Sequence, residues 1–162
     1  MPDDPPVDPE RIINVTLDEH SVVRRSPEIE HERKVAIFDL LEGNWFSLDG
    51  AFRGPYDLFL SIEENRLLID VRDEFSRTLT VVPLPLTPFR RIIKDYFKVC
   101  ESYLAAIKRG SNAQIEALDQ GRSGLHIEGS ELLRDRLEGT VALDLDTARR
   151  LFTLICVLHI RA

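Results

Sequence analysis

The sequence predicts an α+β domain, in which an antiparallel β-meander of about four to five strands packs against a layer of helices. Two observations lead to this prediction. Short segments in which apolar and polar residues alternate are concentrated in the first half of the chain, and segments with apolar residues three and four apart dominate the second half. Only short turns separate most of the strand-like segments, which favours antiparallel pairing because a parallel pair needs a much longer crossover.

The first residues should lie outside this fold. Residues 1–9 hold four prolines and three aspartates and offer nothing to bury, so we expect a disordered leader there and a single α+β domain over residues 10–162. The first helix should begin at Ser26 and Pro27, an N-cap residue followed by proline, and end at Gly43.

Five segments are predicted to be strands. They are residues 11–17, 44–48, 56–63, 67–72 and 77–82. The last of them should stop at Pro83, because proline cannot donate a hydrogen bond to the ladder of a sheet.

The next two helices should form an αα-hairpin. Pro88 repeats the signal of a proline in the first turn and predicts a helix over residues 87–109. Ser111 and Gln114 form a capping box for a second helix over residues 111–138. Because the break between them is so short, the two helices should run antiparallel.

The C-terminal helix, residues 146–159, is apolar nearly all round and should lie buried. Its Cys156, like Cys100 in the hairpin, lies within an apolar helical pattern and predicts a buried thiol in a reducing compartment. We therefore expect a cytoplasmic protein. The net charge of -7 argues against binding to nucleic acid or to an anionic membrane, since both require Lys and Arg to neutralise phosphates.

Residues 119–134, DQGRSGLHIEGSELLR, are the most informative segment. Residues three and four apart share a face of a helix. One face then carries a polar line, which consists of Asp119, Arg122, His126, Ser130 and Arg134. A neighbouring line of leucines and glycines, with Gly121, Gly124 and Gly129, should face the protein. Each helical glycine costs about 0.5–1 kcal/mol relative to alanine, so we expect either a close helix crossing or the close approach of a ligand.

Four residues are candidates for binding a ligand. They are Arg91, Lys94, Arg122 and His126. If these side chains converge between the helices of the hairpin, they would bind an anionic small molecule. The alternative is that the acidic helix neutralises the basic one, and that the polar line is a solvated face.

The sequence predicts no cofactor. Neither a glycine-rich phosphate loop nor a nucleophile elbow occurs in it. His31 lies between two glutamates, but no second histidine at ligand spacing accompanies it. A metal site made of His31, His126 and Glu128 is kept only as an alternative, and no residue is assigned as a metal ligand.

Four segments of the chain resemble a known family. They are EHERKVAIFDLLE (30–42), LTPFRRIIKDYFKVCESYLAAI (86–107), QIEALDQGRSGLHIEGSELLRDRL (114–137) and DLDTARRLFTLICVLHIR (144–161). These segments are similar to small alphaproteobacterial proteins that form an uncharacterised protein family, number 0262. The resemblance implies a bacterial cytoplasmic protein with this domain as its whole chain, and it implies no activity, cofactor or catalytic residue.

The sequence therefore leaves the function open and does not decide whether the protein is an enzyme. The first hypothesis is a noncatalytic interaction or regulatory domain that self-associates or binds a protein partner through the hairpin. The second is a small-molecule binding protein, or a small enzyme, with a basic and histidine-containing site between the helices of the hairpin.

Overall fold

The structure is a computed structural model that describes residues 9–18, 27–50 and 52–159. The leader expected at the start of the chain, apart from Pro9, lies outside these residues, as does Ser26. The elements are β1 Ile12–Leu17, α1 Pro27–Glu42, β2 Phe46–Leu48, β3 Tyr56–Glu63, β4 Arg66–Arg72, β5 Thr78–Pro85, a 3-10 turn Thr87–Phe89, α2 Arg90–Arg109, α3 Asn112–Leu137, β6 Val141–Leu143 and α4 Leu145–His159.

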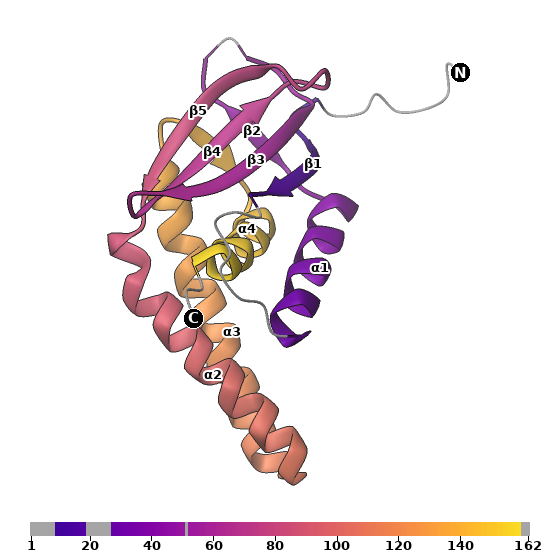
Figure 1. Cartoon of the computed structure of the whole chain (residues 1–162), viewed down its shortest axis with the longest axis vertical. Coiled ribbons are helices and arrows are strands. Elements are labelled where there is room, and N and C mark those ends of the chain that lie inside the picture. The colour runs from indigo at the N-terminus through magenta and orange to yellow at the C-terminus, as the bar shows by residue number, and fades with distance from the viewer. Residues whose placement is uncertain (1–8, 19–26, 51, 160–162) are drawn as a thin grey trace, which may run out of the picture.

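The predicted α+β class is confirmed, and the main sheet has four strands in the order β1-β3-β4-β5 (Figure 1). β3, β4 and β5 form the expected antiparallel meander. β1 departs from the meander, since it pairs with β3 in parallel. The chain reaches β3 only after α1 and β2, and this long connection is what a parallel pair needs.

β2 does not join the main sheet. It pairs with β6 in a separate antiparallel ribbon, in which Ser47 lies opposite Ala142. β6 was not predicted, because three residues are too few to show an alternating pattern.

β5 is longer than the sequence predicted. It continues through Pro83 and ends at Pro85, opposite Leu68 and Arg66 of β4. β5 is the last strand of the sheet, and an edge strand tolerates a proline whose nitrogen faces away from its neighbour. The prediction that Pro83 ends this strand was therefore wrong.

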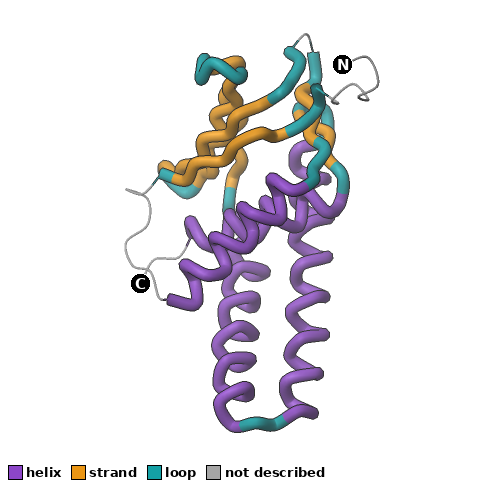
Figure 2. The backbone as a smooth tube through the Cα atoms, turned by 90° about the vertical axis from the view of Figure 1, so that its right-hand side faces the viewer, coloured by secondary structure: helices purple, strands orange, loops and turns teal. Residues whose placement is uncertain are grey.

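α4 lies beneath the sheet, between α1 on one side and α2 and α3 on the other (Figure 1), and it packs against α1 and α3. Every residue from Leu151 to Leu158 is buried, so the prediction of a buried C-terminal helix is confirmed. The side chains that the sheet turns toward α4 are apolar, and they include Leu58, Leu60, Leu67, Ile69, Val71 and Leu84. The helices cover this face of the sheet only (Figure 2).

α2 and α3 form the predicted hairpin, whose far end extends beyond the other elements (Figures 1 and 2). Gly110 ends α2 in the left-handed conformation, with φ 71°, and its N–H donates to the carbonyl groups of Ala106 and Ile107. The predicted capping box is absent: Ser111 makes no side-chain cap, and the Gln114 Oε1 instead accepts a hydrogen bond from Arg109 (3.0 Å). No helix in the described part of the chain is long and apolar enough to span a membrane.

Candidate functional site

The middle of the polar line of α3 turns toward the protein, whereas Asp119 and Arg134 at its ends are exposed. The leucines of the neighbouring line are half-buried, and Gly129 is buried. The His126 ring lies 5.1 Å from the Tyr96 ring of α2 and 6.4 Å from the Phe152 ring of α4, between centroids. Ser130 is fully buried, and its hydroxyl donates to the His126 carbonyl. Gly121 and Gly124 are exposed instead, so the prediction that they face the protein was wrong.

The reason is that α4 packs against α3 at Gly129. A Cβ at this glycine would lie 2.4 Å from the Phe152 ring. The close helix crossing that the sequence predicted for a glycine of this segment therefore occurs at Gly129. A Cβ at Gly121 or Gly124 would meet no atom within 4 Å in the part of the chain that the structure describes, apart from the adjacent backbone of α3. The helix therefore places one glycine against α4 and leaves the other two in the open.

Arg122 is held by side chains from three helices. Its guanidinium carbon lies 4.8 Å from the centroid of the Tyr103 ring of α2. Its nitrogens lie 3.1 Å from Asp119 Oδ1 and 3.7 Å from Glu32 Oε1 of α1. Arg122 therefore links the hairpin to α1, and its positive charge already has two carboxylate partners.

Burial dominates the electrostatics around His126. Burial, together with the positive charges of Arg122 and Arg149, lowers the pKa of His126 to about 4. His126 is therefore neutral at physiological pH. Burial also raises the pKa of Tyr96 and of Cys100. Among the described residues, the buried Nε2 of His126 has no hydrogen-bond partner, whereas the buried hydroxyl of Tyr96 lies against the thiol of Cys100.

The four candidate ligand-binding residues do not share one surface. Arg122 and His126 lie together on the inner side of α3. Arg91 is exposed on the hairpin, where it pairs with Glu128 of α3 and with Asp95 (3.2 Å). Lys94 is exposed as well. The acidic partner expected for the basic helix is thus present at Arg91.

The alternative metal site is not formed. Within the described ranges, no group of three or more His, Cys, Asp and Glu side chains could hold a metal ion. His31 is exposed on α1, whereas His126 packs between aromatic rings. His31, His126 and Glu128 therefore do not come together as the ligands of one metal ion.

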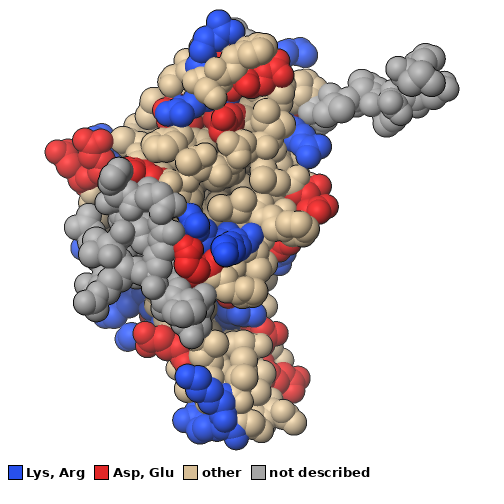
Figure 3. All heavy atoms as spheres, turned by 45° about the vertical axis from the view of Figure 1, so that its right-hand side comes forward, with Lys and Arg blue, Asp and Glu red and all other residues tan. Residues whose placement is uncertain are grey.

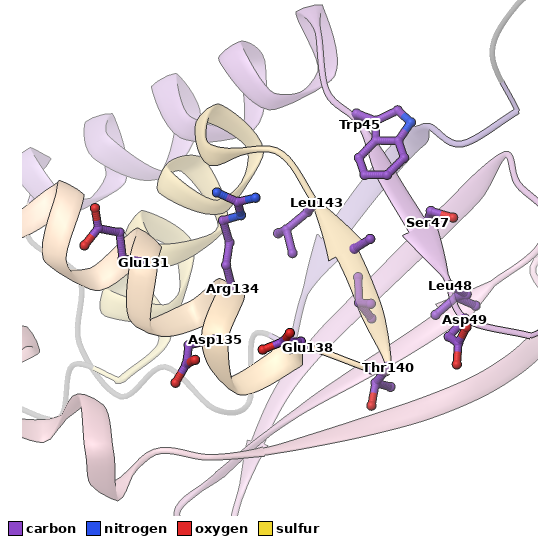
Figure 4. Close-up of a pocket in the computed structure, with 13 residues that line it drawn as sticks. Trp45, Ser47, Leu48, Asp49, Glu131, Arg134, Asp135, Glu138, Thr140 and Leu143 are labelled. Carbon is purple, nitrogen blue, oxygen red and sulfur yellow. The ribbon is translucent and has the colours of Figure 1, made fainter.

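The sequence missed a groove of about 640 Å³ between the C-terminal part of α3 and the β2–β6 ribbon (Figure 4). Trp45, which is 37% exposed, lines it from the ribbon side. Its charged lining residues are Asp49, Glu131, Arg134, Asp135 and Glu138. Four carboxylates against one guanidinium make it an acidic groove. Sequence patterns could not reveal it, because the unpredicted strand β6 builds part of its lining.

The outer face of α3 leads into this acidic groove. It consists of exposed residues three and four apart, which are Ala113, Ala117, Gly121, Gly124, Ile127, Glu131 and Asp135. Its N-terminal half has only small side chains, its middle carries Ile127, which is 50% exposed, and its C-terminal half is acidic. The whole face is available for contact with another molecule.

Comparison with known proteins gives a family and no activity. The model of an uncharacterised protein family (UPF0262) matches residues 9–161. The UPF0262 protein amb3341 of Paramagnetospirillum magneticum is 58% identical over 94% of this chain and 97% of its own length. The UPF0262 protein Rru_A2770 of Rhodospirillum rubrum is 59% identical over 95% of both chains, and the UPF0262 protein PHZ_c2197 of Phenylobacterium zucineum is 56% identical over 93% of this chain and 94% of its own. No solved structure matches the chain.

Proposed function

This chain belongs to the uncharacterised protein family UPF0262, whose alphaproteobacterial members it matches over nearly its whole length, and we propose that it is a noncatalytic interaction domain. It binds another protein through the outer face of α3. As part of the same proposal we place it in the cytoplasm, in keeping with the free thiols of Cys100 and Cys156.

Gly121 and Gly124 carry this proposal. Each costs a helix about 0.5–1 kcal/mol relative to alanine, and the adjacent backbone of α3 aside, no atom of the described residues lies within 4 Å of where either Cβ would be. Packing against the described residues therefore gives no reason for them. A surface without Cβ atoms lets another backbone come close, which explains glycine at both positions.

Two further features support a protein as the partner. The hairpin extends away from the sheet, so a partner can reach its outer side (Figure 2). The outer face also carries Ile127, which would add an apolar side chain to the core of such a contact.

Photo-cross-linking in the bacterium tests the proposal. We expect a photoreactive phenylalanine analogue at Ala117 to give an adduct with one protein that mass spectrometry identifies. The same analogue at Glu101, an exposed position of α2, is the matched control and should give none. The adduct should disappear when Gly124→Leu is added, because a Cβ there has open space among the described residues while the leucine side chain blocks close approach by a partner.

Two outcomes would contradict the proposal. One is an Ala117 position that cross-links no more than the Glu101 position. The other is an adduct that persists unchanged in the Gly124→Leu variant while circular dichroism shows a folded protein.

Binding of an anionic small molecule is the second candidate function. Its support is the buried Nε2 of His126, which has no hydrogen-bond partner among the described residues. Arg122 lies in the same cluster, whereas Arg91 and Lys94 do not. Thermal melts with phosphate and with simple carboxylates test this function: a dose-dependent rise in melting temperature that Arg122→Gln abolishes supports it, and no rise with any of them contradicts it.

A further inference from the structure

Resting on the proposed function, we infer that the partner of the outer face of α3 is a second copy of this chain. The two copies lay their α3 helices antiparallel, and each places its basic hairpin tip, Lys108 and Arg109, in the acidic groove of the other. The contact is the same in both directions, so the pair closes as a twofold dimer.

The outer face of α3 has the composition that such a pairing needs. Its small half, which includes Ala117, Gly121 and Gly124, lets two helix backbones approach closely at the centre. Its acidic half, with Glu131 and Asp135, would repel the same half of another copy in a parallel arrangement. An antiparallel arrangement instead sets each acidic half against the small half and the basic tip of the other copy.

The spacing along the helix fits this pairing. Suppose that the twofold axis passes midway between Gly121 and Gly124. At 1.5 Å per residue, Asp135 then lies about 19 Å from the axis in one direction along α3, and Gly110 lies about 19 Å from it in the other direction. The tip of one copy therefore reaches the level of Asp135 in the other. This is the part of α3 that lines the groove.

The charges of the two surfaces are complementary. Lys108 and Arg109 are exposed, and positive side chains gather at the end of the hairpin in Figure 3. Arg109 already reaches across to α3, where it donates to Gln114 Oε1 (3.0 Å), so its guanidinium lies on the α3 side of the tip. The groove offers four carboxylates against the single guanidinium of Arg134.

Apolar contacts can add to the charge pairing. Ile107, next to the tip, is 47% exposed, and Trp45 in the groove is 37% exposed. Apolar and aromatic side chains form the core of protein interfaces, and polar side chains form the rim.

A charge-swap experiment with the full chain tests the inference by light scattering and sedimentation. We expect a mass of twice 18.6 kDa for the unchanged protein. The tip variant Lys108→Glu/Arg109→Glu and the groove variant Glu131→Lys/Asp135→Lys should each weaken dimerisation at least about tenfold, because each places like charges together. The fourfold variant, which carries both changes, should dimerise again.

The matched control is Lys94→Glu/Lys98→Glu, which makes the same charge change as the tip variant at two exposed positions of α2. It should dimerise like the unchanged protein. Loss of the dimer in this control, or failure of the fourfold variant to recover it, would show that net charge and not the tip-to-groove contact governs association, and would overturn the inference.

Failure of this inference is distinct from failure of the proposed function. At a protein concentration of about 100 µM even a weak dimer would form, so a monomer at this concentration overturns self-association. The cross-link at Ala117 still decides whether α3 binds a different protein. If that cross-link is absent as well, both proposals fail.

Discussion

Gly129 of α3 lies directly against the ring of Phe152 of α4, because a Cβ at this position would come within 2.4 Å of Cε1 of Phe152. This contact fixes the rotation of α3 about its own axis. It turns His126 and Ser130 toward the interior and turns Gly121 and Gly124 outward. The candidate interaction surface therefore depends on a glycine that is not itself part of that surface.

Gly129→Ala should destabilise the protein. The added methyl group must displace the buried Phe152 ring, and overpacking of this kind costs about 1–3 kcal/mol. Thermal or urea unfolding of the variant measures the loss. A melting temperature equal to that of the unchanged protein would show that α3 and α4 can separate freely.

Gly124→Ala should have the opposite effect on the monomer. Its Cβ has open space, and alanine is favoured in a helix by about 0.5–1 kcal/mol, so the free energy of unfolding should rise. Unfolding at low protein concentration measures it apart from association. A fall in stability in this assay would indicate that Gly124 makes a contact inside the chain.

The protein should become less stable as the pH is lowered, because the folded state resists protonation of His126. The pKa of this side chain is about 4 when folded and 6.5 when unfolded, so the unfolded state binds more protons between these values. The stabilisation is fully present above about pH 6.5 and is lost progressively toward pH 4, by roughly 2–3 kcal/mol.

The variant His126→Phe isolates this effect. It keeps a ring between Tyr96 and Phe152 but cannot take up a proton. Urea unfolding at about pH 7 and about pH 4.5 should show a smaller loss for the variant than for the unchanged protein. A titration of His126 by NMR with a midpoint near its unfolded value would refute the prediction.

Asn44→Ala should cost about 2–4 kcal/mol, because Asn44 substitutes for a neighbouring strand at β1. Its Oδ1 accepts from Ile12 N–H (2.7 Å), and its Nδ2 donates to the carbonyl groups of Ile12 (2.9 Å) and Leu40 (2.8 Å). Asn14→Ala is the control, since its single bond to Asp57 is exposed (3.3 Å) and its loss should cost less than about 1 kcal/mol. Equal costs in denaturant unfolding would contradict this account.

Arg122 and Tyr103 should be energetically coupled. A double-mutant cycle with Arg122→Met and Tyr103→Leu should give a coupling free energy of about 0.5–1 kcal/mol, as expected for a guanidinium over a partly buried ring. Unfolding of the four proteins in denaturant measures it. Additive effects would mean that the ring does not hold Arg122, and the guanidinium would then be freer to bind a ligand.

The sequence by itself determined the local structure. The spacing of apolar residues predicted four helices and the strands of the meander, and the short break at Gly110 predicted the hairpin, because such signals act within a few residues of chain. Residues four apart share a helix face, so the proximity of Arg122 and His126 was also predictable.

Only the tertiary structure decided which face of α3 turns inward. Polar and glycine lines flank one another on this helix, and hydrophobic periodicity assigns the polar line to solvent. The contact of Gly129 with Phe152 and the packing of the His126 ring against Tyr96 outweigh that preference. The parallel pairing of β1, the passage of β5 through Pro83 and the ribbon of β6 were likewise set by partners distant in the chain, whose packing no local pattern records.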